Sequence, residues 1–252
     1  MDRAARRSPA GARAGRTGGH HLGRHDYPLK TVAEFVTSAA EARDLPQDNL
    51  PQIALVGRSN VGKSSLINAL VRQRVARTSA APGKTRLANV YRVQRSSPFY
   101  LVDLPGYGFA RALRHAQGER ETEFRGLATD VVQQVDAALL LVDARHPGLA
   151  NDVSAWAWLT DTVATRGLVA TKMDKLSRAE RLRAMHEIEA VFDHPVTAVS
   201  ATTGEGLDEL WKLIDRLNSR NPPPHRSPPP PNPTAAVDRP RHRRQKNSSS
   251  RR

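Results

Sequence analysis

The stretch Gly57-Arg58-Ser59-Asn60-Val61-Gly62-Lys63-Ser64 decides the fold, because it fits the pattern G-x-x-x-x-G-K-[ST]. Glycines let the backbone curl until successive N–H groups point inward, and a following helix adds the positive end of its dipole. Such a loop cradles phosphate groups. We therefore expect all eight residues to bind a nucleotide. Lys63 would reach its terminal phosphates in a catalytic role, and the Ser64 hydroxyl would bind Mg²⁺.

The surroundings of this loop agree with that interpretation. An apolar strand at 52–56 precedes it, and a helix through Leu66 and Leu70 follows it. Further along, short apolar runs alternate with helical patterns, which is typical of βαβ units. We expect an α/β P-loop fold of three layers, with a mostly parallel sheet and helices on both faces.

The other expected elements follow from periodicity. Strands are predicted at 87–93, 99–103, 137–142 and 196–200. Helices are predicted at 178–192, with Leu182, Met185, Ile188 and Phe192 along one face, and at 207–217.

The tetrapeptide Asp103-Leu104-Pro105-Gly106 ends one of these strands. A P-loop nucleotide hydrolase needs an acidic residue at this place to hold Mg²⁺, largely through water. Gly106 leaves a backbone N–H close enough to meet a γ-phosphate. We therefore predict that these four residues contact the nucleotide and its metal ion.

The stretch Thr171-Lys172-Met173-Asp174 predicts the choice of base. Guanine presents two adjacent donors, and a single carboxylate accepts both as a charge-assisted pair. Adenine offers no such pair, so Asp174 favours GTP over ATP, while the Lys172 stem lies along the base. Val199-Ser200-Ala201, at the end of the next predicted strand, brings a backbone N–H to the guanine oxygen.

A switch loop is predicted between the P-loop helix and the strand at 87–93. It needs a threonine whose hydroxyl completes the Mg²⁺ shell when the γ-phosphate is present. Thr85, preceded by Gly83 and Lys84, lies nearer the strand and is preferred over Thr78. Thr85 is therefore a candidate metal ligand and catalytic residue.

No catalytic base is visible. Tyr107 follows Gly106, where signalling GTPases commonly have a glutamine that orients water, so intrinsic hydrolysis should be slow. Asn60 offers a side-chain oxygen that could help to hold K⁺ beside the phosphates in a catalytic role, or it could merely shape the loop. The strand before Thr171 looks short, since only Leu168-Val169-Ala170 precede that residue, and such a strand would fray and weaken guanine binding.

Positive charge is concentrated at the two ends of the chain. Residues 1–25 contain six Arg and one acidic residue, and residues 221–252 contain seven Arg, one Lys and one acidic residue. These ends hold +12 of the formal net charge of +14. We expect disordered segments at 1–26 and 221–252 around a nucleotide-binding domain at 27–220. The ends are either solvated and dispensable or an electrostatic arm for RNA.

Composition excludes several classes of protein. The chain has no cysteine, so it has no disulfide framework or cysteine-based metal site. No apolar run approaches the roughly 20 residues of a membrane span. We expect a cytoplasmic monomer without a membrane partner.

Beyond the nucleotide motifs, the sequence resembles the EngB (YihA/YsxC) family of GTPases over about residues 30–218. The resemblance rests on Ala33-Glu34-Phe35-Val36, residues 57–68, Pro82-Gly83-Lys84-Thr85, Asp103-Leu104-Pro105-Gly106-Tyr107-Gly108, Val142-Asp143-Ala144-Arg145-His146-Pro147 and Thr171-Lys172-Met173-Asp174-Lys175. The tyrosine in the second acidic motif and the D-x-R-H-P run separate this family from other P-loop GTPases.

The resemblance implies GTP binding with slow hydrolysis, Mg²⁺ held by Ser64 and Thr85, and action in large-subunit ribosome assembly. The partners would be GTP or GDP and the large ribosomal subunit with its rRNA, and the family is linked to cell division and septation. Two alternatives stay open: a G domain in another process, such as tRNA modification or signalling, and a non-hydrolysing RNA-binding protein.

Overall fold

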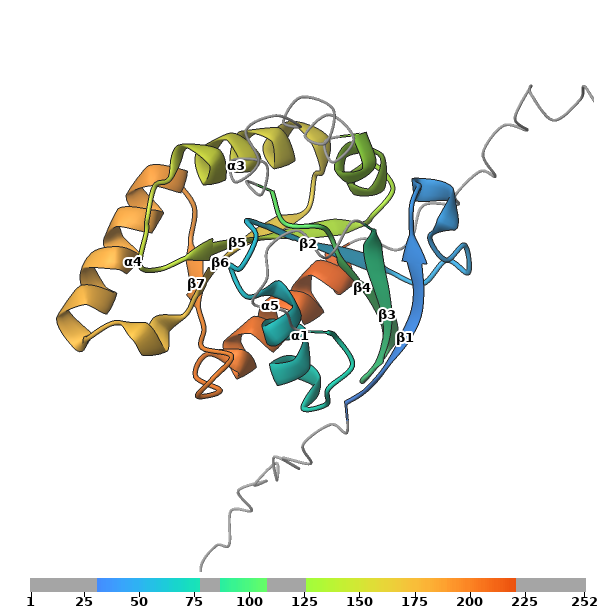
Figure 1. Ribbon diagram of the computed structural model, residues 1–252, viewed down its shortest axis with the longest axis horizontal. Helices are drawn as coiled ribbons and strands as arrows, with labels where there is room; N and C mark the ends of the chain where they lie inside the picture. Colours follow the sequence, from blue (N-terminus) through green and yellow to red (C-terminus); the bar gives the residue numbers. More distant parts are fainter. Residues whose placement is uncertain (1–30, 78–86, 108–125, 221–252) are drawn as a thin grey trace, which may run out of the picture.

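The computed structural model describes residues 31–77, 87–107 and 126–220, which form one sheet with helices on both faces (Figure 1). The strands are β1 (Val32–Ala39), β2 (Gln52–Gly57), β3 (Ala88–Gln94), β4 (Pro98–Asp103), β5 (Ala137–Asp143), β6 (Arg166–Thr171) and β7 (Val196–Ala198). They lie in the order β1-β3-β4-β2-β5-β6-β7. β2 pairs in parallel with β4 and β5, and β6 pairs in parallel with β5 and β7, so the predicted parallel sheet is confirmed.

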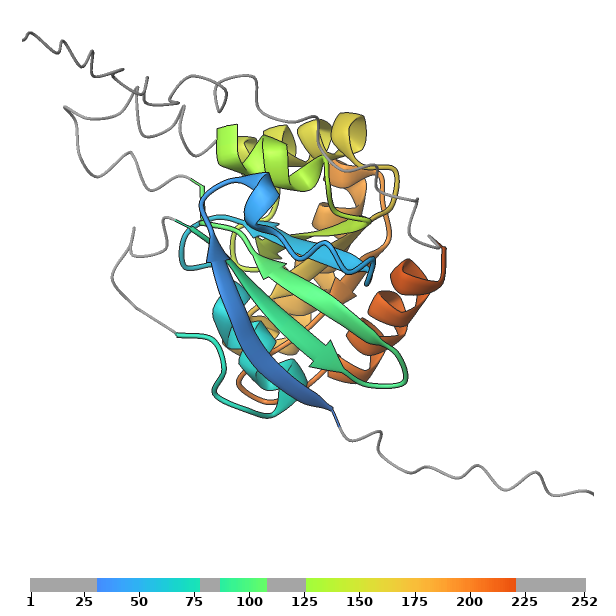
Figure 2. The same ribbon diagram turned by 90° about the vertical axis from the view of Figure 1, so that its right-hand side faces the viewer.

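Helices cover the sheet in two layers. The α-helices are α1 (Lys63–Val71), α3 (Ala150–Thr162), α4 (Arg178–Phe192) and α5 (Leu207–Arg220), with a further helical stretch at 126–132 and short 3₁₀ turns η1 (Ala42–Asp44) and η3 (Met173–Lys175). One core cluster joins α1 and α5 to one face of the sheet. A second joins α3, α4 and 126–132 to the other face, and Figure 2 shows the sheet between the two layers.

The central strands are buried because helices cover both of their faces. Every residue of β2 and of β5 is buried, which explains why their sequences are continuous apolar runs without alternation. The predicted strand at 137–142 is therefore confirmed, extended by Asp143. Because β2, β4, β5, β6 and β7 run in the same direction, their carboxyl ends meet at one edge of the sheet.

The sequence analysis missed the helical stretch at 126–132 and, more notably, β1 and α3. β1 is an antiparallel edge strand on β3, with a register shift between Phe35 and Thr37. It escaped prediction because an edge strand is exposed along much of its length: Phe35 and Val36 are both solvent-exposed. α3 also lacked a clear apolar stripe, since only Asp152 and Leu159 among its residues are buried.

The expectation of a short, frayed strand before Thr171 is wrong. β6 has six residues, of which Gly167 to Thr171 are all buried. The strand continues through Gly167 in parallel pairing with β5, and an added Cβ there would lie 2.9 Å from Leu139 and 3.0 Å from Leu213. A glycine in a tightly packed strand looks like a break in the apolar run, although it lies in the core.

The predicted face of α4 is correct only in part. Ile188 and Phe192 are buried in the core as expected, but Leu182 is 60% exposed and Ala184 takes the inward position. The helix begins where Ser177 and Glu180 form a reciprocal capping box. Within the described residues, none of the helices has the length and apolar character needed to cross a membrane.

Candidate nucleotide-binding site

The glycine-rich loop connects the carboxyl end of β2 to the first turn of α1. Two of its residues adopt left-handed backbone angles, Asn60 with φ of 64° and Gly62 with φ of 109°. Gly62 caps α1, and its carbonyl accepts the hydrogen bond of Leu66 at 2.8 Å. The loop therefore wraps around the N-terminal end of a helix, which is the geometry that binds anions.

Lys63 folds back over its own loop. Its Nζ donates to the carbonyl of Gly57 at 2.9 Å and to that of Arg58 at 3.3 Å. The residue is buried. Burial lowers the pKa of Lys63, and the carboxylate of Asp103 opposes that shift. The ammonium group is thus held at the mouth of the loop, at the place predicted for a phosphate contact.

Ser64 and Asp103 lie side by side at the ends of α1 and β4. The Ser64 hydroxyl donates to Asp103 Oδ2 at 2.7 Å. The other carboxylate oxygen, Oδ1, is buried and has no hydrogen-bond partner among the described residues. Burial raises the pKa of Asp103, whereas Lys63 and the Ser64 hydrogen bond act in the opposite direction. A buried oxygen without a partner beside a hydroxyl fits Mg²⁺, which prefers oxygen ligands and keeps several waters.

Gly106 lies directly against the loop. A Cβ on Gly106 would come within 2.5 Å of the backbone nitrogen of Ser59, so no other residue fits without movement. The next residue, Tyr107, accepts a hydrogen bond at its carbonyl from the Ser59 N–H at 2.9 Å. Leu104 and Pro105 are buried, and they carry the chain from β4 to this contact.

The carboxyl end of β6 is joined to the same loop. The Thr171 hydroxyl lies 2.8 Å from the carbonyl oxygen of Val61 and 3.1 Å from that of Val142. Lys172, with φ of 62°, donates from Nζ to the carbonyl of Asn60 and to Asp143 Oδ2. The Lys172 stem therefore extends across the gap between the phosphate loop and the residues predicted to read the base.

Asp174 is held by two neighbours. Ser200 donates from Oγ to Asp174 Oδ1 at 2.8 Å, and Lys175 Nζ lies 3.2 Å from Oδ2. Burial tends to raise the pKa of Asp174, but the hydrogen bonds from Ser200 and Lys175 outweigh it and leave the pKa below its usual value. The carboxylate therefore stays ionised, as the predicted pairing with guanine requires.

Two of the predicted base-site residues, Met173 and Val199, are joined to each other through the backbone. The side chain of Met173 is buried in the core, and its N–H donates to the carbonyl of Val199 at 3.2 Å. Val199 is also fully buried, and Ala201 is half-buried beside Ser200. Gly83, Lys84 and Thr85, predicted for the switch loop, lie outside the described residues, as does the alternative Thr78.

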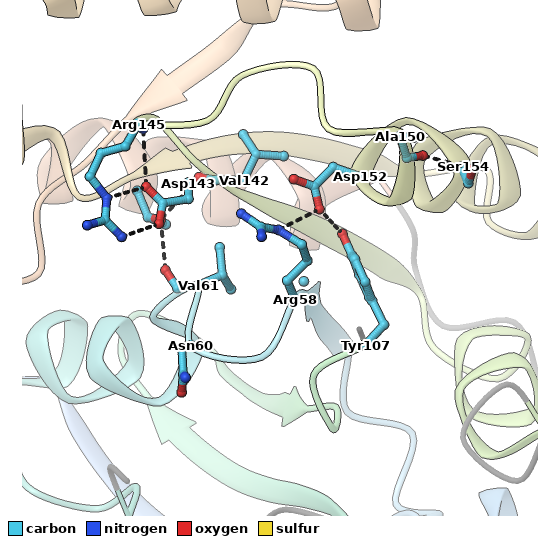
Figure 3. A network of polar contacts seen from close by, with 12 residues as sticks. Arg58, Asn60, Val61, Tyr107, Val142, Asp143, Arg145, Ala150, Asp152 and Ser154 are labelled. Atoms are coloured by element: carbon cyan, nitrogen blue, oxygen red, sulfur yellow. Dashed lines mark hydrogen bonds and ion pairs between the residues drawn. The ribbon is translucent and has the colours of Figure 1, made fainter. Parts of the chain in front are cut away.

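Three polar residues at this edge were not predicted as site residues. Asp143 receives two bonds from the Arg145 guanidinium, at 2.9 Å and 2.7 Å (Figure 3). Burial tends to raise the pKa of Asp143, but bonds from Arg145 and Lys172 lower it well below its usual range. For Asp143 the sequence did offer a signal, because an acidic residue directly follows the predicted strand at 137–142. Asp152 on α3 had no such signal, because its contact depends on how α3 packs.

Fold and site together define a class. One edge of a parallel sheet carries a glycine-rich loop at a helix N-terminus, an acid with an unpartnered oxygen beside that loop, and an ionised carboxylate, Asp174, in the segment predicted to read guanine. This is the arrangement of a P-loop protein that binds guanine nucleotides.

Comparison with known proteins agrees. Residues 52–172 match the family described as 50S ribosome-binding GTPase. The chain is 44% identical over 190 residues to the "Probable GTP-binding protein EngB" of Pelotomaculum thermopropionicum, covering 73% of this chain and 94% of that one. It is 42% identical over 191 residues to the protein of the same name from Chlorobaculum tepidum, covering 73% and 96%. The chain belongs to the EngB family of GTPases, and it is a GTP-binding protein that hydrolyses GTP.

Solved structures support the fold. Era of Aquifex aeolicus bound to GDP and AlF₄⁻ matches with a TM-score of 0.58 and 24% identity, covering 67% of this chain and 57% of that one. A structure titled as a probable GTP-binding protein EngB matches with a TM-score of 0.53 and 24% identity, covering 68% of this chain and all of that one. Era in complex with MgGDPNP and nucleotides 1506–1542 of 16S ribosomal RNA matches with a TM-score of 0.58 and 25% identity, covering 67% and 57%.

Proposed function

We propose that this chain is a GTP-dependent switch in assembly of the large ribosomal subunit, and that cell division and septation depend on it through that role. The observation that carries the proposal is the match of residues 52–172 to a family described by binding to the 50S subunit. Era, 57% of which is matched by this chain, is a further protein with this fold that has been solved with MgGDPNP and a segment of 16S ribosomal RNA. A cytoplasmic location follows from a ribosomal partner.

In this proposal the described residues bind and orient the substrate. Lys63 neutralises charge at the terminal phosphates, and the N–H of Gly106 faces the γ-phosphate. Ser64 and Asp103 are the candidate holders of Mg²⁺, with Thr85 completing the set. The metal ion supplies charge neutralisation when bound. The support for this assignment is the unpartnered Oδ1 of Asp103 beside the Ser64 hydroxyl.

Slow intrinsic turnover is part of the proposal. The Tyr107 hydroxyl donates to Asp152 at 2.7 Å, so it is engaged with α3 and does not serve to orient water. An added group, either the ribosomal particle or K⁺ near Asn60, would then raise the rate. The K⁺ hypothesis is checked by comparing hydrolysis in K⁺ and Na⁺ for the natural protein and for Asn60→Ala. Equal rates of hydrolysis in K⁺ and Na⁺ for the natural protein would rule out the K⁺ hypothesis.

The test of the main proposal is co-sedimentation of the full-length protein with purified large subunits. We expect more protein to bind with a non-hydrolysable GTP analogue than with GDP, at both low and moderate salt. Small subunits serve as the control particle. Equal binding in the two nucleotide states would contradict a switch. Binding to neither particle would favour a G domain in another process, and binding without any nucleotide dependence or hydrolysis would favour an RNA-binding protein.

A further inference from the structure

A group of three polar side chains lies at the phosphate loop, and two of its members, Tyr107 and Asp152, have no proposed nucleotide contact. It consists of Arg58 in the loop, Tyr107 directly after Gly106, and Asp152 in the first turn of α3 (Figure 3). The Tyr107 hydroxyl donates to Asp152 Oδ1 at 2.7 Å, and Arg58 Nε lies 3.3 Å from the same oxygen. We call this group the clasp.

The burial of Asp152 makes the clasp energetically important. The side chain of Asp152 is 1% exposed, and its second oxygen, Oδ2, has no hydrogen-bond partner among the described residues. A buried carboxylate is costly unless donors and counter-charges surround it. Here the contacts described are one hydroxyl and one guanidinium nitrogen. Movement of Tyr107 away from α3 would therefore remove one of few compensating interactions.

Tyr107, a member of the clasp, also contacts the phosphate loop through its backbone. The Tyr107 carbonyl accepts from Ser59 N–H at 2.9 Å, and Arg58 and Tyr107 form an isolated parallel bridge. Gly106, the residue immediately before Tyr107, lies so close to Ser59 that no Cβ fits. The backbone of Gly106 is thus fixed by main-chain contacts to the loop and by a side-chain contact to a helix.

We propose that Asp152 and Tyr107 are positioning residues that, together with Arg58, hold the Gly106 N–H where a γ-phosphate would meet it. The clasp then favours GTP over GDP, because GDP has no γ-phosphate for Gly106 to contact. The inference rests on the proposed role of Gly106 and extends it to Tyr107 and Asp152, for which no nucleotide contact is proposed. A hydrogen bond to a buried carboxylate contributes roughly ten- to a hundredfold in an equilibrium.

The test compares the variants Tyr107→Phe, Asp152→Asn and the double variant of the full-length protein. Binding of GDP and of a non-hydrolysable GTP analogue is measured by calorimetry with Mg²⁺, and hydrolysis is followed in single turnovers. We expect GDP affinity to stay within about twofold, while affinity for the analogue or the rate of hydrolysis falls about tenfold. Because the two side chains act through one bond, the double variant should be no worse than the more affected single variant.

The chain contains a matched control. The Tyr100 hydroxyl donates to Asp48 Oδ2 at 2.7 Å, and Tyr100 pairs with Gln52 at the opposite end of β2 from the phosphate loop. Tyr100→Phe likewise removes a hydroxyl from a carboxylate, but Asp48 is exposed whereas Asp152 is buried. We expect it to lower the melting temperature less than Tyr107→Phe does and to leave both nucleotide affinities unchanged.

The outcomes separate the clasp from other roles. Equal weakening of GDP and the analogue would overturn the inference, since it would mean that the clasp only supports the loop. Additive effects in the double variant, or no effect on the analogue and on hydrolysis, would also overturn it. Failure of the natural protein to bind any guanine nucleotide would instead contradict the function proposed for the site.

Discussion

At the scale of single residues, we expect Asp174 to set the choice of nucleotide. Asp174 is ionised, its Oδ1 accepts a hydrogen bond from Ser200, and its Oδ2 lies beside the Lys175 ammonium group. Asp174→Asn replaces one acceptor by a donor, so GTP affinity should fall by about 10- to 100-fold while xanthosine triphosphate gains. Calorimetry with both nucleotides checks this, with the exposed Asp161→Asn as the control. Unchanged GTP affinity in Asp174→Asn would show that another residue reads the base.

Asp103 should show opposite effects on stability and function. Its pKa is raised by burial, so the folded state is penalised as pH rises above 3.8, the ordinary value, and that penalty disappears in acid. Asp103→Asn should therefore keep or raise the melting temperature of the nucleotide-free protein at pH 7. Mg²⁺-dependent tightening of GTP binding should fall tenfold or more, because a charged ligand is lost. Thermal melts measure the stability, and GTP titrations with and without Mg²⁺ measure the metal dependence. A lower melting temperature of Asp103→Asn at pH 7 would contradict burial as the cause of the raised pKa of Asp103.

At the scale of elements, the junction of β7 and α5 positions Val199-Ser200-Ala201, the segment predicted to contact guanine. Gly206 has φ of 75°, and a Cβ there would lie 1.9 Å from the carbonyl oxygen of Ala198. Gly206→Ala should lower the free energy of unfolding by more than about 3 kcal/mol. It should also weaken the binding of GTP, because Val199 and Ser200 must move.

Gly204 separates backbone strain from the clash. Its φ is 83°, but the nearest atom to an added Cβ is 4.0 Å away. Gly204→Ala should therefore cost only about 1–2 kcal/mol and leave GTP affinity unchanged. Denaturant titrations of both variants give the comparison. Similar losses in the two would mean that backbone conformation, and not the contact with Ala198, controls this junction.

At the scale of the whole molecule, most of the net positive charge lies in segments outside the candidate nucleotide site. Residues 1–25 and 221–252 hold +12 of the +14 net charge, although the site is built from residues 57–201. A protein of residues 27–220 should bind GTP as the full chain does. Its association with large subunits should be weaker and less dependent on salt, because fewer phosphates are neutralised. Co-sedimentation over a salt series tests this; complete loss of association would assign the RNA contact to the ends of the chain.

Local signals determined most of the candidate site. The glycine-rich loop, Asp103-Leu104-Pro105-Gly106 and Thr171-Lys172-Met173-Asp174 were found because each needs particular residues at fixed spacing at the end of a strand. The structure brings these segments to one edge of the sheet, as parallel strands require. Backbone curvature, helix capping and ligand chemistry act over a few residues, so a sequence records them directly.

Packing over long sequence separations decided the rest. β6 continues through Gly167 because it pairs with β5 there and lies packed against Leu139 and Leu213, and β1 is a strand that pairs with the edge of β3. The contact of Tyr107 with Asp152, 45 positions away, has no local signature. By itself the sequence determined the nucleotide motifs and the mostly parallel character of the sheet. Only the tertiary structure decided which buried acid meets which donor, because desolvation and hydrogen bonding depend on which elements pack together.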